Sequence, residues 1–546
     1  MLAKLKRNFK QELDPWSGST LFLALIILAP LLTVAIGLGD TGPKWEHLKS
    51  TVLFGYVSNT IILSLSVVIL ATLFAVPSAW LVTAYEFPGR GLFSWALALP
   101  LAIPTYVAAF VYYQFPEAAI PLLVYIRSAW GIDAFQTAET LLRYGLLATF
   151  MAAVLYPYIY LSARASFSQQ RRQVIEAAQT LGRSPRSVFL SIALPLSRPA
   201  LAAGIGLVVM EVINDYGAVH FFGVPTLTEG IFRTWFGLAD RSSALRLAGF
   251  IMVVVFAILL LEKTTRGRAR FAEPSNSALP IRRRRLKGLP ALASSMTCLI
   301  PLTLGFLFPA AQLLIWTSQT FSRVFRADFI HHLLNSLLLA FATALVLTAL
   351  SLLIAYTVKL RPGKWLRGIV GISALGYSIP GAVVAVGVMV SLGNVDRLNA
   401  SWLKTEDGPK LLLSGTLTAI GFAYIVRFLA VSLQPLQSGL RRVCGSLDEA
   451  SRTLGVGPAK TLCKINIPLL KGTLIAAFTL VFVDILKELP LTMILRPANF
   501  ETMATTAFSL AKEGRIRECA VPSFIILITG AIGLGLINRF LKIESP

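Results

Sequence analysis

Twelve long apolar stretches constrain the fold of this chain more than any other feature. Each holds roughly 18 or more mostly apolar residues, enough to cross a hydrocarbon layer of about 30 Å as a helix. The 546 residues are 55% hydrophobic and 14% charged, which is too apolar for a soluble protein of this length. We therefore predict an all-α polytopic membrane protein with about twelve transmembrane helices, at 20–38, 52–84, 92–113, 140–163, 199–219, 243–262, 292–318, 333–358, 368–391, 411–433, 469–487 and 520–541.

The net charge of +23 is concentrated in a few of the segments between these stretches. Lys and Arg cluster in the N-terminal tail, in 164–198 and in 263–288. Twelve alternating crossings from a cytoplasmic N-terminus place all three segments in the cytoplasm, as the positive-inside bias requires. The sequence thus predicts that both termini are cytoplasmic. It favours a topogenic role for the basic segments over a role in binding nucleic acid, with contact between the polybasic linker and anionic membrane lipid as the alternative.

The chain contains an internal duplication with a shift of 273 residues, half of its length. The segment Glu176–Gly182 is followed by Pro185 and Pro195, and Glu449–Gly455 is followed at the same spacings by Pro458 and Pro468. We predict a first permease-like half at 1–262, a polybasic cytoplasmic linker at 263–291 and a second half at 292–546. With six helices in each half, the repeats would run parallel about an axis along the membrane normal.

The repeated cytoplasmic segments, 164–198 and 434–468, are longer than a connection between two membrane helices requires. In the first copy, Gly182 is suited to a left-handed helix C-cap, and Ser184 and Pro185 are suited to start a second short helix. Pro195 is expected to end that helix at the bilayer. Each segment is thus predicted to form a compact helical elbow, able to transmit force from a cytoplasmic partner.

The pattern Glu-Ala-Ala, three residues, Gly, nine residues and Ile-x-Leu-Pro resembles the cytoplasmic loop motif of membrane subunits of bacterial ATP-binding cassette importers. The second copy departs from it at Ser451 and Ile467. The resemblance implies a type I importer permease fold in a bacterial inner membrane, with two ATP-binding cassette subunits docked in the cytoplasm and a substrate-binding protein on the outer face. It implies that the ATPase-coupling residues are Glu176, Ala177, Ala178, Gly182, Glu449, Ala450, Ser451 and Gly455.

No Gly-x4-Gly-Lys-Ser/Thr sequence occurs in the chain, so the chain has no phosphate-binding loop of that kind. ATP is therefore expected to be used by a separate ATPase, and the chain itself is expected to be neither an enzyme nor the holder of a cofactor. A proton-coupled transporter of the major facilitator type is the alternative from another class. Such a transporter would carry Gly-x3-Asp-Arg-x-Gly-Arg after its second helix, where this chain reads Ala84–Arg90 without a match.

The region after the fifth predicted helix of each half resembles the ferric iron permeases of this superfamily. The residues that carry the resemblance are Asn214–Val219, Phe222–Val224 and Gly230–Phe236 in the first half, and Lys487–Thr492, Leu495–Pro497 and Asn499–Thr502 in the second. The resemblance implies import of ferric iron. Fused permeases for thiamine or organophosphonates share the architecture and stay open as alternatives.

Four acidic residues within predicted helices are candidates for lining the translocation path. Each half has a pair four residues apart, which would share one face of a helix. Carboxylates so placed repel each other unless a cation or a proton intervenes, and oxygen ligands suit hard cations. Structural ion pairs with Lys487, Arg233 or Arg496 are the alternative, and no metal ligand set is assigned. The candidates are Glu211, Asp215, Asp484 and Glu488.

Overall fold

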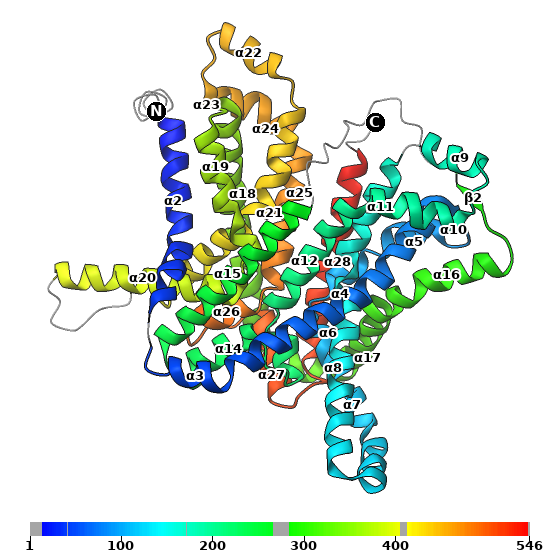
Figure 1. Cartoon of the computed structure of the whole chain (residues 1–546). Helices are drawn as coiled ribbons and strands as arrows, with labels where there is room; N and C mark the ends of the chain where they lie inside the picture. Colours follow the sequence, from blue (N-terminus) through cyan, green and yellow to red (C-terminus); the bar gives the residue numbers. More distant parts are fainter. Residues whose placement is uncertain (1–13, 41, 171, 266–282, 404–411, 544–546) are drawn as a thin grey trace.

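The computed structural model describes residues 14–40, 42–170, 172–265, 283–403 and 412–543. They are overwhelmingly helical, as the apolar stretches predict (Figure 1). The first half contains α2 (Pro15–Ile36), η1 (Gly37–Gly39), α3 (Trp45–Thr51), α4 (Leu53–Ala84), β1 (Tyr85–Glu86), α5 (Arg90–Ala96), η2 (Leu99–Ala102), α6 (Thr105–Tyr112), α7 (Gln114–Ala118), α8 (Ile120–Gln169), α9 (Arg172–Thr180), α10 (Pro185–Val188), η3 (Phe189–Ala193), α11 (Leu194–Leu196), α12 (Arg198–Asn214), α13 (Gly217–Phe221), α14 (Leu227–Phe232), η4 (Arg233–Gly237) and α15 (Arg241–Thr265).

The second half has a related but not identical series of elements. It contains β2 (Arg284–Arg285), α16 (Leu289–Leu302), η5 (Thr303–Leu307), α17 (Phe308–Val324), α18 (Ala327–Leu360), α19 (Lys364–Ser373), η6 (Ala374–Ser378), α20 (Gly381–Leu403), α21 (Leu417–Arg442), α22 (Gly445–Thr453), α23 (Pro458–Thr461), η7 (Leu462–Asn466), α24 (Ile467–Leu469), α25 (Lys471–Leu486), α26 (Pro490–Leu495), α27 (Met503–Lys512) and α28 (Ala520–Ile543).

The predicted membrane spans coincide in position with helices of the structure, but some of them are broken into two bent helices. Within the described ranges, eight helices are long and apolar enough to cross a membrane unaided, and eleven spans result if each of three sharply bent helix pairs forms one span. The bends measure 89° after α5 and η2, 69° between α11 and α12, and 81° between α24 and α25. The twelfth predicted stretch, 520–541, corresponds to α28.

Each half has a core of three helices, α4, α8 and α12 in the first and α18, α21 and α25 in the second. The first helix of each half, however, packs on the other half. Helix α2 lies against α19 and α20, and α16 with η5 lies against α4 and α8. Two glycines allow these approaches, because a Cβ on Gly387 of α20 would meet the Pro30 carbonyl of α2, and one on Gly305 of η5 would meet the Ala153 carbonyl of α8.

The ends of the predicted linker are ordered, although 266–282 lie outside the described residues. Helix α15 continues to Thr265 and α16 begins at Leu289, so helices occupy both edges of the predicted 263–291 segment. Between them, β2 pairs in parallel with β1, with Tyr85 opposite Arg284 and Glu86 opposite Arg285. This pairing holds the start of the second half against the loop that follows α4.

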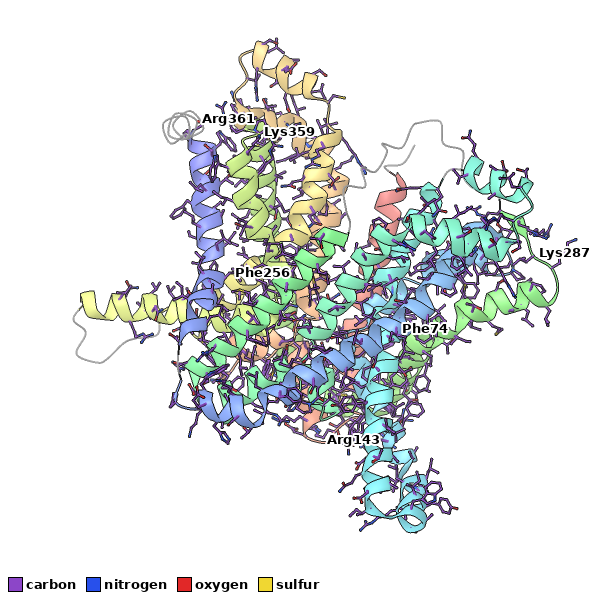
Figure 2. The ribbon with its side chains drawn as sticks, viewed as in Figure 1. Phe74, Arg143, Phe256, Lys287, Lys359 and Arg361 are labelled. Atoms are coloured by element: carbon purple, nitrogen blue, oxygen red, sulfur yellow. The ribbon has the colours of Figure 1, made fainter. Side chains whose placement is uncertain are left out.

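The elbows and the described chain ends lie at one end of the molecule, called here the elbow end. The start of α2, the end of α28, α9 and α22 all lie at the top of Figure 1. Lys287, Lys359 and Arg361 also lie toward this end (Figure 2). At the opposite end, α7 and the first turns of α8 form a projection that the sequence did not predict, and α8 is broken within it at Gly131, where φ is 87°.

Candidate functional site

The two predicted coupling loops form matching elbows. The first elbow, Arg172–Leu196, and the second elbow, Gly445–Leu469, consist of the same four helical segments, and each segment begins 273 residues after its counterpart. The predicted Ser184 cap is present, since the Ser184 hydroxyl accepts a hydrogen bond from the Ser187 amide at 3.3 Å. The expectation that Pro195 ends the second short helix was wrong. Pro195 lies within α11, and the chain bends two residues later, at Ser197.

The elbow glycines have the left-handed conformation predicted for them. Gly182 has a φ of 80° and Gly455 a φ of 73°. In the first elbow, the amide after the glycine, that of Arg183, donates to the Ala178 carbonyl at 3.1 Å, and Val456 donates to Ser451 in the second elbow at 3.0 Å. These contacts satisfy carbonyls at the ends of α9 and α22 and fix the angle to the next helix.

The departure of the second motif copy at Ser451 has a structural reason. The Ser451 hydroxyl lies 2.6 Å from that of Thr461, and both side chains are buried. Their counterparts in the first elbow are Ala178 and Val188, which are also buried. A hydrogen-bonded pair thus replaces an apolar pair, which keeps both buried hydroxyls satisfied.

Each elbow is tied to a long helix of its own half. In the first half, the Trp80 ring of α4 lies 5.2 Å from the Phe189 ring, centroid to centroid. In the second, Lys359 of α18 forms an ion pair with Asp448 at 2.7 Å. Burial raises the pKa of Asp448, but the hydrogen bonds from Lys359 and Asn466 and nearby positive charge more than offset it, so the pKa lies below its ordinary value. The pair therefore persists at neutral pH and ties the second elbow to α18.

Both elbows present exposed apolar side chains at matching positions. Leu181 and Leu454 are 84% and 81% exposed, and Val174 and Leu447 are 44% and 43% exposed. Positions seven apart lie on one face of a helix, so each elbow carries an apolar stripe that faces away from the bundle. The predicted coupling residues Ala177 and Ala450 lie on this exposed side, whereas Ala178 and Ser451 point inward.

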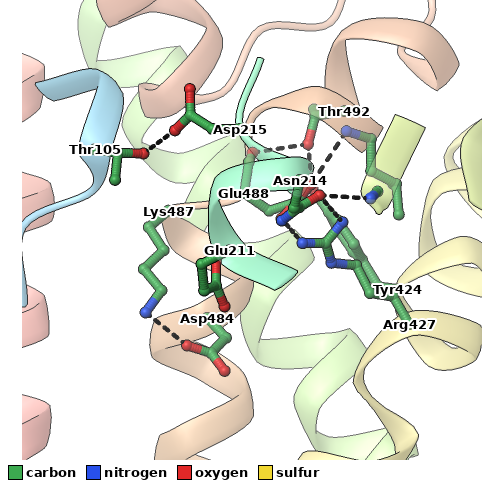
Figure 3. A network of polar contacts seen from close by, with 12 residues as sticks. Thr105, Glu211, Asn214, Asp215, Tyr424, Arg427, Asp484, Lys487, Glu488 and Thr492 are labelled. Carbon is green, nitrogen blue, oxygen red and sulfur yellow. Dashed lines mark hydrogen bonds and ion pairs between the residues drawn. The ribbon is translucent and has the colours of Figure 1, made fainter. Parts of the chain in front are cut away.

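A second site lies between the two halves, away from the elbows. A cavity of about 100 Å³ is lined by all four candidate acids, Glu211 and Asp215 from the first half and Asp484 and Glu488 from the second (Figure 3). The duplication thus brings the four carboxyl side chains to one cavity. Tyr158 and Tyr377 add a phenol from each half.

The prediction that each acid pair shares a single helix was wrong. Helix α12 ends at Asn214 and α25 ends at Leu486, so the second acid of each pair lies in a break that follows the helix. Asp215 accepts hydrogen bonds from Thr105 and from the Ala218 amide at the start of α13. Glu488 likewise accepts a bond from the amide of Leu491 in α26, at 3.1 Å. These acids stabilise the first turns of the short helices that follow the breaks.

Two basic side chains reach into the cavity, and both come from the second half. Lys487 forms an ion pair with Asp484 at 2.8 Å, one of the structural pairings left open by the sequence. Arg427 of α21 pairs with Glu488 at 3.4 Å. Glu211 accepts a hydrogen bond from the Tyr158 hydroxyl at 3.4 Å and, among the described residues, forms no ion pair with Lys or Arg.

The two arginines predicted as possible partners of the acids have partners elsewhere. Arg233 pairs with Glu229 at 2.5 Å, and Arg496 pairs with Glu501. Arg427 was not among the predicted site residues, although the sequence carries a signal for it, since it is the charged residue of the predicted span 411–433. A charge at membrane depth marks a functional site by default.

The cavity does not contain a ready-made metal cage. Among the residues that the structure describes, no three His, Cys, Asp or Glu side chains gather closely enough to hold a metal ion. The acids are held apart by hydrogen bonds and ion pairs. Such an arrangement can attract a cation by charge without enclosing it in a complete set of ligands.

Comparison with known proteins identifies the fold and the duplication. The family model described as "Binding-protein-dependent transport system inner membrane component" matches residues 53–262 and again residues 348–542. The chain is 23% identical over 502 residues to the Fe(3+)-transport system permease protein FbpB 2 of Haemophilus influenzae, covering 89% of each chain. It is 23% identical to the probable ABC transporter permease protein y4fN of Sinorhizobium fredii, covering 96% of this chain and 94% of that one.

A different kind of relative matches only part of the chain. The sulfate transport system permease protein CysT of Escherichia coli is 27% identical over 213 residues, which is 37% of this chain and 72% of that protein. Because the chain resembles permeases named for different solutes, the comparison identifies its architecture but not the solute that it transports. The two matched regions cover most of the chain and coincide with its two structural halves, and the chain therefore belongs to the family of binding-protein-dependent transport system inner membrane components, as one polypeptide that carries the permease domain twice.

Proposed function

We propose that this permease imports ferric iron across a bacterial inner membrane. It would receive the ion from a binding protein on its outer face and be driven by two separate ATPase subunits docked on the elbows. The observation that carries the proposal is the cavity between the halves, where four acidic side chains face two basic ones. A surplus of carboxylates attracts a cation and repels an oxyanion such as sulfate.

Two further observations support iron over the alternatives. The relative named for Fe(3+) transport matches along 89% of this chain, whereas the sulfate permease matches 37% of it. The cavity of about 100 Å³ is also small for thiamine or an organophosphonate, because pockets for drug-sized ligands measure roughly 300–1,000 Å³. Membership of the family sets aside the major facilitator alternative, since the permease domain occurs twice.

The exposed stripe on each elbow supports docking of two ATPases. Leu181 and Leu454 would be unfavourable in water, but an apolar cleft of a partner would cover them. Two equivalent stripes fit two copies of one partner. Movement of that partner would reach the acidic cavity through α12 and α25, which follow the elbows directly and end beside the acids.

Uptake by cells tests the cargo. A strain deleted for this gene and complemented with the wild-type chain is expected to regain uptake of radiolabelled ferric iron, with no change in sulfate uptake. Depletion of ATP should stop iron uptake, whereas a protonophore should leave it largely intact while ATP is maintained. Restoration of sulfate uptake without iron uptake would refute the proposal.

Cysteine labelling tests the orientation. Lys287, which follows β2, and Ser128, in the first turns of α8, are both exposed. In a variant with the four native cysteines replaced, Lys287→Cys is expected to react with an impermeant maleimide only after the membrane is opened, and Ser128→Cys in intact spheroplasts. Labelling of both from outside would contradict a cytoplasmic elbow end.

A further inference from the structure

The acids of the cavity are symmetric between the halves, but their counter-charges are not. At the shift of 273 residues, Glu211 matches Asp484 and Asp215 matches Glu488. The same shift pairs Arg427 with Val154 and Lys487 with Asn214, and all of these residues line the cavity. The second half thus supplies both positive charges, while the first half supplies acids without basic ion-pair partners in the described part of the chain.

Arg427 occupies an unusual position within this asymmetric cavity. Its side chain is 7% exposed, and its two terminal nitrogens face Glu488 at 3.4 Å and Asn214 at 3.3 Å (Figure 3). Its Nε is buried and has no hydrogen-bond partner in the structure. Gly381 is needed beside it, because a Cβ there would collide with the guanidinium group.

Arg427 also takes part in the contact between the halves. Asn214 lies at the end of α12 in the first half. Its side-chain oxygen accepts a hydrogen bond from Arg427 at 3.3 Å and one from the Gly381 amide at 2.8 Å. Both donors belong to the second half. One acceptor atom therefore joins the halves twice, and a shift of Arg427 would remove one of the two bonds.

We propose that Arg427 is a tethered cation that balances the acidic cavity when it is empty, and that the arriving cargo cation takes its place beside Glu488. This inference rests on the proposed function. Buried carboxylates without a counter-charge are costly, so the empty cavity needs an internal cation. A trivalent ion that enters repels the guanidinium group, and the displaced Arg427 releases Asn214 and loosens the contact between the halves.

Binding of Tb³⁺, a hard trivalent cation whose luminescence is sensitised by nearby tyrosine, provides the test. Tyr158 and Tyr377 line the cavity, so a bound ion there should be visible. In the purified permease in nanodiscs, Arg427→Gln is expected to bind Tb³⁺ about tenfold or more tightly than the wild type, because one positive charge has been removed from a poorly screened site. Arg427→Lys should bind as the wild type does, and the exposed Arg323→Gln is the matched control.

Arg427→Gln leaves Glu488 charged and unpaired, so this variant alone could fail to fold. A second pair of variants keeps the test valid in that case. Glu488→Gln is expected to weaken Tb³⁺ binding, and adding Arg427→Gln to it should restore affinity to about the wild-type level. In iron uptake, removal of Arg427 should lower both the half-saturating concentration and the maximal rate, because the ion is held more tightly and leaves more slowly.

The inference is overturned if the double variant binds Tb³⁺ no more tightly than Glu488→Gln alone. It is also overturned if the loss of Arg427 lowers the uptake rate without tightening binding, which would indicate a purely structural residue. These outcomes differ from failure of the proposed function, which would appear as an absence of iron uptake by the wild type.

Discussion

Replacing Gly182 by valine is expected to abolish ATP-driven uptake while leaving a folded permease in the membrane. Gly182 has a φ of 80°, and no atom lies within 4 Å of the position that a Cβ would take. The substitution therefore causes no collision, and its cost is conformational, about 1–2 kcal/mol and more for a β-branched residue. This is too little to unfold the bundle but enough to change the angle between α9 and α10, on which the position of the exposed stripe depends.

The measurement is iron uptake together with recovery of the ATPase in pull-downs of the permease. Gly514→Val is the matched control, since Gly514 follows α27 with a φ of 79°, has no neighbour within 4 Å of a Cβ and lies outside both elbows. It should carry the same backbone strain and retain uptake. Normal uptake and normal ATPase recovery with Gly182→Val would remove the elbow from the coupling mechanism.

Replacing Glu211 by glutamine is expected to reduce iron uptake by about tenfold or more, and by more than Asp484→Asn does. The two acids are equivalent by the duplication, but Asp484 is already paired with Lys487, whereas Glu211 is bonded to the Tyr158 hydroxyl. A unit charge about 4 Å from a cation is worth about 4 kcal/mol at an effective dielectric constant near 20, and more for a trivalent ion. The charge without a basic partner should therefore contribute most to attracting the cargo.

Initial rates of iron uptake at equal amounts of permease in the membrane give the comparison. Glu211→Gln keeps the shape of the side chain and disturbs neither break, because Glu211 lies within α12. Asp215 and Glu488 are not used in this comparison of single variants, because each also caps a short helix and its replacement would change two interactions at once. Equal losses for Glu211→Gln and Asp484→Asn would show that the asymmetry in counter-charge has no bearing on transport.

Local signals in the sequence were sufficient for the elbows. Gly182 and Gly455 are predictable because only a few residues cap a helix in the left-handed conformation. The break at Asp215 was not predictable in this way, because the predicted apolar span 199–219 runs through it and its partner Thr105 lies far along the chain. The break at Glu488 has a local signal, since Pro490 starts α26 just beyond the predicted span 469–487.

Contacts between membrane helices were even less predictable from the sequence. Lipid is as apolar as leucine, so a helix that contacts protein and one that contacts lipid have similar compositions. The exchange of α2 and α16 between the halves therefore could not be read from their residues. The small residues at the contacts, Gly305 and Gly387, become informative only when the partner helix is known.

The exchanged helices also have a consequence for biosynthesis. Helix α2 leaves the ribosome long before its partners α19 and α20, which follow roughly 330 residues later, on the order of half a minute at ordinary rates of synthesis. Helix α16, by contrast, emerges after α4 and α8 are already inserted. Because lipid can cover the inner face of α2, where Ile27 and Val34 are buried in the finished protein, the delay costs little hydrophobic energy. The last step of assembly would then be lateral, when α2 moves through the bilayer to pack against the newly made second half.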